Sequence, residues 1–139
     1  VVFPVHPNPA VREVAEEWLS GRDRIHLIDP LPYPEFLPLL SRAWLLVSDS
    51  GGLQEEAPTL GKPLLILREN TERPEAVECG AARLIGGSAF RLRQELESAH
   101  ADETWSREVA QMTNPFGDGA AAGRIATALL QPVSSVAAA

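Results

Sequence analysis

Residues 44–67 read WLLVSDSGGLQEEAPTLGKPLLIL. The apolar run at 44–48 predicts a strand buried on both faces, and Gly51 opens a segment of helical composition that ends at Gly61. A second apolar run, at 63–67, predicts another buried strand. A strand, a helix and a second strand in this order indicate a βαβ unit, in which the two strands are parallel and the crossover is right-handed.

The same alternation extends over the rest of the 139-residue chain. It predicts one α/β domain over 1–131: a Rossmann-like parallel sheet with helices on both faces and with residues 44–48 as its central strand. We expect residues 132–139 to be a frayed tail. Because the chain opens directly on a strand, we expect the natural protein to continue upstream. The predicted strands are 1–5, 24–28, 44–48, 63–67 and 83–85, and the predicted helices are 10–19, 33–40, 51–60, 74–78, 89–99, 103–112 and 120–130.

Composition argues against several classes of protein. The formal net charge of −7 argues against a nucleic-acid-binding protein with a broad basic face. No apolar run approaches the ~20 residues that a membrane helix needs, and the first residues lack the features of a signal peptide. The single cysteine, Cys79, excludes an internal disulfide, so we expect a reducing, cytoplasmic location. His26 and His100 lack the spacing of a metal site, and we expect neither a metal nor a cofactor.

The turn after strand 44–48 offers the groups that a diphosphate needs. Ligands of open α/β sheets bind outside the carboxyl ends of the strands, where a helix N-terminus presents free N–H groups and the positive end of its dipole. Ser50 adds a hydroxyl donor, and Gly51 and Gly52 have no side chain to hold a pyrophosphate away. Glu56, four residues after Gly52, can share its helix face and accept from paired hydroxyls such as those of a ribose. The alternative is a plain strand–turn–helix in which the glycines serve only the turn.

Three other strand-end loops carry candidate binding residues. Arg73 follows strand 63–67 and supplies a forked, permanently charged donor for phosphate or hydroxyl groups, unless it is an ordinary surface arginine. His6 stands close to two prolines and can hold or protonate a phosphate leaving group, unless it only bonds to local backbone. Phe36 follows a proline-rich loop and offers a flat face to a nucleobase, with a place in the core as an equal alternative.

Four motifs occur in the order and at the spacing of one enzyme family. They are PVHPNP at 4–9 with VRE at 11–13, the block at 49–63, TERPE at 71–75 and NPFGDG at 114–119. Over about residues 2–130 the chain resembles the carboxyl-terminal half of the non-hydrolysing UDP-N-acetylglucosamine 2-epimerases. The resemblance implies a glycosyltransferase-B architecture, in which two Rossmann-like domains enclose the active site. This chain would be the second domain, truncated at its start.

The resemblance also implies a reaction and a role for each candidate residue. The family turns UDP-N-acetylglucosamine into UDP-N-acetylmannosamine, for cell-surface polysaccharide biosynthesis, by eliminating UDP and adding it back to the unsaturated sugar. Residues that stabilise the departing UDP therefore take part in catalysis. The implied roles are diphosphate binding by Ser50, Gly51 and Gly52, ribose binding by Glu56, nucleotide binding by Arg73, uracil contacts by Phe36 and the backbone of Leu31, and a catalytic place beside the phosphate and the sugar for His6.

Two departures from the family pattern matter. The family's acid and base carboxylates lie in the amino-terminal domain, so the resemblance implies that this domain is a required partner and that the chain alone is inactive. Some members bind a second substrate molecule through an arginine and a histidine whose places here hold Pro7 and Leu37, which argues against activation of that type. The formation of a homodimer is left open by the sequence. The alternatives are a hydrolysing epimerase, a glycosyltransferase donor domain and a non-catalytic nucleotide-sugar-binding module.

Overall fold

The structure is a computed structural model that describes residues 1–130. The described residues form two compact units, Val1–Arg42 and the part of the chain from Ala43 onward. The predicted tail at 132–139 lies outside the described residues, and the single domain over 1–131 stays a prediction. None of the described helices is long and apolar enough to cross a membrane.

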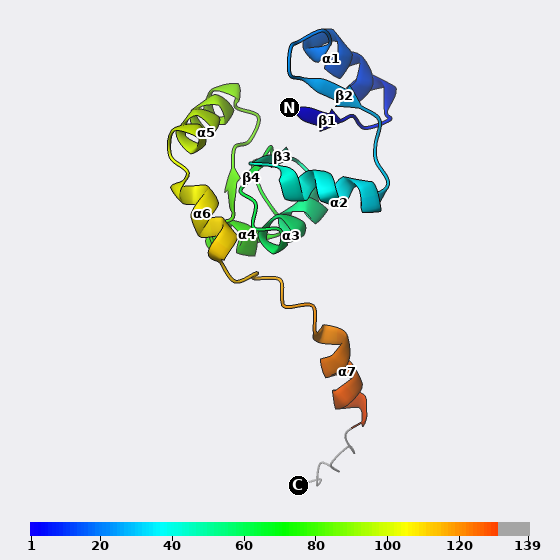
Figure 1. Ribbon diagram of the computed structural model, residues 1–139, viewed down its shortest axis with the longest axis vertical. Helices are drawn as coiled ribbons and strands as arrows, with labels where there is room; N and C mark the ends of the chain where they lie inside the picture. Colours follow the sequence, from blue (N-terminus) through cyan, green and yellow to red (C-terminus); the bar gives the residue numbers. More distant parts are fainter. Residues whose placement is uncertain (131–139) are drawn as a thin grey trace. The chain divides into compact units, whose positions relative to one another are not determined.

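The first unit is a two-stranded parallel sheet with two helices. Strand β1 (Val2–Pro4) pairs with β2 (His26–Ile28), and the crossover between them is α1 (Pro9–Leu19), which packs against β2 (Figure 1). Asn8 starts α1 because its side chain accepts a hydrogen bond from the Ala10 N–H and because Pro9 suits the first helical position. Helix α2 (Tyr33–Arg42) completes this unit.

The second unit contains a three-stranded parallel sheet in the order β3-β4-β5. In this sheet Ser48 is level with Ile66, and Ile66 with Leu84. The predicted βαβ unit at 44–67 is therefore confirmed. The elements of this unit are β3 (Leu46–Ser48), α3 (Gly51–Thr59), β4 (Leu64–Ile66), α4 (Pro74–Glu78), β5 (Ala82–Leu84), α5 (Ala89–Ala101), α6 (Thr104–Gln111) and α7 (Ala121–Leu130).

Strand β4, rather than β3, is the central strand of this sheet, so the prediction that placed 44–48 at the centre is wrong. Leu64, Leu65 and Ile66 are each 0% exposed, whereas Val47 in β3 is 43% exposed. Trp44, which was expected to belong to the buried strand, precedes β3 and is 45% exposed. An apolar run shows that a strand packs on something, but an edge strand and a central strand can have the same composition.

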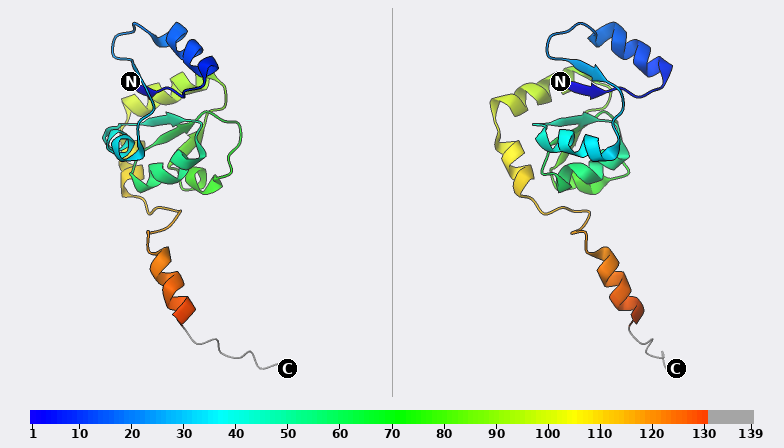
Figure 2. Two further views of the ribbon diagram at one scale, coloured as in Figure 1. Left: turned by 90° about the vertical axis from the view of Figure 1, so that its right-hand side faces the viewer. Right: turned by 45° about the vertical axis from the view of Figure 1, so that its right-hand side comes forward.

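Helices cover both faces of the sheet in the second unit (Figure 2). Leu65 packs with Ala99 of α5 and with Trp105 and Val109 of α6. Because side chains alternate along a strand, Leu64 and Ile66 point to the opposite face, where α3 packs against β4 and α4 against β5. The α/β arrangement with helices on both faces is confirmed here.

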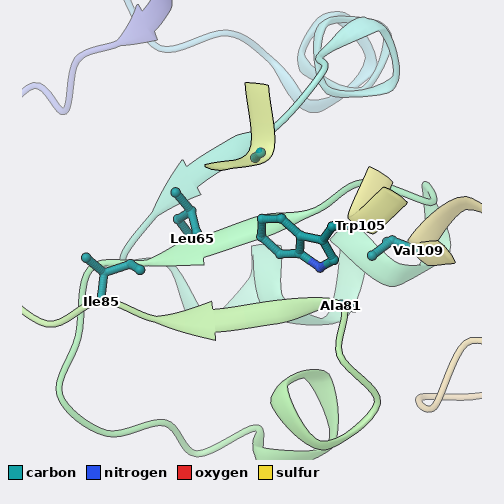
Figure 3. Close-up of a cluster of buried hydrophobic side chains, with 6 residues drawn as sticks. Leu65, Ala81, Ile85, Trp105 and Val109 are labelled. Atoms are coloured by element: carbon teal, nitrogen blue, oxygen red, sulfur yellow. The ribbon is translucent and has the colours of Figure 1, made fainter. Parts of the chain in front are cut away.

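Trp105 is the largest side chain of the core cluster on the α5–α6 face (Figure 3). The residue is 7% exposed, and its indole N–H donates a hydrogen bond of 2.8 Å to the Gly80 carbonyl. The Arg83 guanidinium lies 3.9 Å from the ring centroid, so a cation–π interaction covers the ring. This tryptophan therefore joins α6 both to β5 and to the turn that precedes β5.

Trp105→Phe removes the indole N–H and leaves the Gly80 carbonyl without its partner. Gly80 is exposed, so its carbonyl can bond to water, and we expect the free energy of unfolding to fall by about 0.5–1.5 kcal/mol, the net contribution of one hydrogen bond. Urea denaturation measures this loss. Trp18→Phe is the matched control because Trp18 is 66% exposed, and it should stay within about 0.5 kcal/mol of the wild type. Equal effects of the two substitutions would contradict the role assigned to Trp105.

Candidate functional site

The loops that follow β3, β4 and β5 lie at one edge of the sheet, because the three strands are parallel and in register. Ser50 is the residue before α3, and its N–H donates to the Ser48 hydroxyl at 3.0 Å. The Ser50 hydroxyl makes no capping bond to α3, and the residue is exposed. The first turn of α3 thus points its N–H groups outward at the carboxyl end of the sheet, as the sequence predicts.

Gly51 and Gly52 have different surroundings. A Cβ atom on Gly51 would lie 2.7 Å from the Glu72 Oε1 atom, so the missing side chain lets the Glu72 carboxylate lie against the start of α3. A Cβ atom on Gly52 would find only the Ser50 Oγ atom within 4 Å, at 3.8 Å. A side chain at Gly51 would therefore displace the flexible Glu72 carboxylate, whereas the space beside Gly52 is open to a ligand.

Arg73 meets the start of α3 through its side chain. The Arg73 Nε donates to the Glu55 Oε1 atom, and the Arg73 Nη1 atom lies 3.8 Å from the Glu72 Oε1 atom. The hydrogen bond to Glu55 and the neighbouring carboxylates raise the pKa of Arg73, so its charge is permanent. The Arg73 side chain is 34% exposed and forms an ion pair with Glu55 of α3, and its contact with a nucleotide stays a prediction.

The loop after β4 carries a second ion pair. Arg68 donates from one nitrogen to both carboxylate oxygens of Glu72, at 3.1 and 2.8 Å. A hydrogen bond from its own backbone N–H, together with the charge of Arg68, lowers the pKa of Glu72.

Glu56 lies in α3 one turn after Gly52 and is half-buried, so the helical spacing expected from the sequence holds. Among residues 1–130, no group of three or more histidine, cysteine or carboxylate side chains could hold a metal ion.

The remaining candidates belong to the first unit. His6 is exposed, and its Nδ1 atom accepts a hydrogen bond from the Asn8 N–H at 3.1 Å. This is the bond to local backbone that the sequence left as an alternative, and it leaves Nε2 as the donor of the neutral ring. Phe36 in α2 and Leu31 before it are both half-buried. A site shared by these residues and the second unit stays a prediction.

Gln54, Glu55 and Thr71 were not singled out from the sequence. Gln54 is 0% exposed, its Oε1 accepts from the Thr71 hydroxyl, and that hydroxyl accepts from the Arg73 N–H at 2.9 Å. Helical spacing is the sequence signal that could have identified Gln54, because Gln54, Ala57 and Pro58 form the buried face of α3.

The NPFGDG motif serves the fold between α6 and α7. The Asn114 Nδ2 donates to the Thr59 hydroxyl at 2.7 Å, which ties this loop to the end of α3. Asp118 accepts two hydrogen bonds from Arg124, at 2.8 and 2.6 Å, and one from the Ala120 N–H at 3.0 Å. These bonds lower the pKa of Asp118 to about 2 and order the start of α7.

Comparisons with known proteins identify the family of the chain. The family model described as UDP-N-acetylglucosamine 2-epimerase matches residues 1–130. A probable UDP-N-acetylglucosamine 2-epimerase of Ralstonia nicotianae is 48% identical over 129 residues, and the UDP-N-acetylglucosamine 2-epimerase of Escherichia coli K12 is 46% identical over 129 residues. Each alignment covers 93% of this chain, but the chain spans only about a third (34%) of the length of these relatives.

Solved structures give the same result. The UDP-GlcNAc 2-epimerase from Neisseria meningitidis, bound to UDP-GlcNAc, matches with a TM-score of 0.87 and 40% identity over 94% of this chain and 35% of its own. The S. aureus MnaA–UDP co-structure matches with a TM-score of 0.86 and 42% identity over 92% of this chain and 35% of its own. The Rossmann-like fold and the relationship inferred from the four motifs are thus confirmed, and the chain belongs to the UDP-N-acetylglucosamine 2-epimerase family.

Proposed function

We propose that this chain is the UDP-binding half of an enzyme that converts UDP-N-acetylglucosamine into UDP-N-acetylmannosamine. The observation that carries the proposal is the meeting of two strand-end loops in the second unit. The turn at Ser50–Gly52 lies beside the loop that holds Arg73, through the contacts of Gly51 with Glu72 and of Arg73 with Glu55. Family membership and the UDP-bound and UDP-GlcNAc-bound neighbours support a nucleotide sugar as the ligand.

The turn at the start of α3 is the place for the diphosphate. Gly51 and Gly52 occupy the first positions of the helix, where backbone N–H groups have no carbonyl partner within the helix. The exposed Ser50 hydroxyl adds a further donor, and the open side of Gly52 leaves room for the phosphate oxygens. Glu56, one turn later on the same helix, accepts from the ribose hydroxyls, and Arg73 supplies a permanent positive charge to the nucleotide.

The first unit supplies the other contacts. Phe36 and the backbone of Leu31 flank the uracil. His6 stands beside the phosphate and the sugar with Nε2 as its donor, because Nδ1 is already engaged by the Asn8 N–H. The hydrogen bond to Nδ1 fixes the tautomer of the neutral ring and therefore the nitrogen that can donate to a phosphate.

In the proposed reaction the sugar loses UDP and regains it. A base removes the proton from carbon 2, the electron pair forms the double bond to carbon 1, and the carbon 1–oxygen bond breaks as UDP leaves. Return of a proton to the opposite face of carbon 2 and of UDP to carbon 1 completes the inversion. This chain stabilises the charge on the departing UDP and retains it, whereas the carboxylates that move the proton belong to the amino-terminal domain.

The two arginines of the loop after β4 are engaged in ion pairs. Both Arg68 and Arg73 are already paired with carboxylates, so a diphosphate must compete for them. A diphosphate would therefore have to displace Glu55 from Arg73, and Glu72 from Arg68, to use these two cations. Residues 49–75 contain the acidic Asp49, Glu55, Glu56, Glu69, Glu72 and Glu75 and the basic Lys62, Arg68 and Arg73.

The direct test follows UDP-N-acetylglucosamine by proton NMR in D2O. The full-length protein should form UDP-N-acetylmannosamine with deuterium at carbon 2, because the proton removed there exchanges with solvent before a new one is added. The chain of 139 residues alone should form none. Release of free UDP and N-acetylmannosamine would identify a hydrolysing enzyme, and no turnover by the full-length protein would refute the proposal.

Gly52→Ala tests the diphosphate site. The added methyl group would meet only the Ser50 Oγ atom, at an ordinary contact distance of 3.8 Å, so the thermal midpoint should stay the same or rise, since glycine in a helix is roughly 0.5–1 kcal/mol less favourable than alanine. The methyl group would occupy the ligand's space, so UDP affinity should fall about tenfold or more. Gly123→Ala in α7 is the matched control, because it meets open space and should leave UDP affinity unchanged. Unchanged affinity in Gly52→Ala would place the diphosphate elsewhere.

Glu56→Gln tests the ribose contact by removing the charge at nearly constant size. Calorimetry should show that UDP binding weakens by about 1.5–3 kcal/mol, the range for hydrogen bonds to charged groups, while pyrophosphate binding changes little. Glu78→Gln, at an exposed position in α4, is the control. An equal loss for UDP and for pyrophosphate would mean that Glu56 acts on the phosphates or on the fold instead.

A further inference from the structure

Gln54 is the buried polar side chain of the described residues, with 0% of its surface exposed. It lies on the inner face of α3 beside Ala57 and Pro58, where an apolar side chain would pack without losing hydration. Burying a carboxamide is costly unless its oxygen and nitrogen find hydrogen-bond partners. The hydrogen bonds that the Gln54 carboxamide makes must therefore explain why an amide occupies this buried position.

Both ends of the Gln54 carboxamide are bonded, and each end reaches a different loop of the candidate site. The Nε2 atom donates to the Ser50 carbonyl at 3.4 Å, in the turn before α3. The Oε1 atom accepts from the Thr71 hydroxyl, in the loop after β4. One buried side chain thus connects the end of β3 to the loop that follows β4.

Thr71 extends this connection to the backbone of Arg73. Its hydroxyl gives its proton to Gln54 and accepts from the Arg73 N–H at 2.9 Å, so its orientation is set from both sides. The Arg73 backbone is held in this way, and the Arg73 side chain is held separately by Glu55 of the same helix. No buried side-chain nitrogen or oxygen among the described residues lacks a partner, so the connection is complete without any further group.

We propose that Gln54 and Thr71 are positioning residues that hold the Ser50–Gly52 turn and Arg73 at the separation one nucleoside diphosphate requires. The inference rests on the proposed function, because it concerns the same site. A fully bonded buried network keeps a fixed geometry, and a site that is fixed before the ligand arrives loses less conformational entropy on binding. Neither residue needs to touch the ligand for this effect.

The test measures UDP affinity in the full-length protein. Thr71→Val keeps the shape of the side chain but removes the hydroxyl, and it should raise the dissociation constant for UDP about tenfold. Thr71→Ser keeps the hydroxyl and should restore affinity to near the wild-type value. Gln54→Met, of similar length, should reproduce the loss of Thr71→Val.

Thr59→Val is the matched control. Thr59 lies at the far end of α3, and its hydroxyl also makes two hydrogen bonds, to the Glu55 carbonyl at 3.2 Å and from Asn114 at 2.7 Å. If loss of a hydroxyl acts only through stability, Thr59→Val and Thr71→Val should have the same effect on UDP affinity. The proposal expects no change in the dissociation constant for Thr59→Val.

A double-mutant cycle with Arg73→Ala separates positioning from independent binding. Thr71 acts through Arg73, so the loss in the double variant should be smaller than the product of the two single losses. Losses that multiply in full, or wild-type affinity in Thr71→Val, would overturn the positioning role and leave the proposed function intact. A wild-type full-length protein that does not bind UDP would overturn both.

Discussion

Burial of β4 on both faces is the constraint on which the second unit depends. Leu65 is covered by α5 and α6, and Leu64 and Ile66 face the side of α3 and α4, so the strand cannot shift without opening one of two packed layers. A slip by one residue would exchange the two faces of the strand. The register with β3 and β5 is fixed as a result, and the loops after the three strands are brought to one edge of the sheet. The position of the candidate site is thus a consequence of core packing.

At that edge, polar and charged side chains set the finer geometry. The two arginines after β4 are held by Glu72 and Glu55, and the buried Gln54 links the turn before α3 to Thr71. These bonds keep the loops in place, but they also occupy the cationic groups that an anionic ligand would attract. The site is therefore well ordered and poor in available positive charge. An anionic ligand would therefore meet backbone donors at the start of α3 and two arginines that are already ion-paired.

Local patterns in the sequence identified the elements well. The apolar runs, the glycines after them and the prolines at helix starts predicted the described strands and helices to within a few residues, and the four motifs predicted the family. The order of the strands in the sheet could not be predicted, because Val47 in the outer strand β3 and Leu65 in the central strand β4 occur in similar apolar runs. The proximity of Glu55 and Gln54 to the loop after β4 depends on how α3 is rotated about its axis, which tertiary packing decides. Whether His6, Leu31 and Phe36 join the second unit in one site stays a prediction.

The position of strand β3 at the side of the sheet also affects how the chain can pair with other molecules. It forms an edge of the three-stranded sheet and carries the half-exposed Val47, with the half-exposed Trp44 just before it. An edge strand can hydrogen-bond to an extended strand of another molecule, and the length of only three residues in β3 limits how many such bonds can form. Such pairing is bimolecular, whereas packing of β4 is not, so concentration shifts the balance between them. Any strand pairing by β3 would therefore increase with the concentration of the chain, whereas the packing of β4 does not depend on concentration.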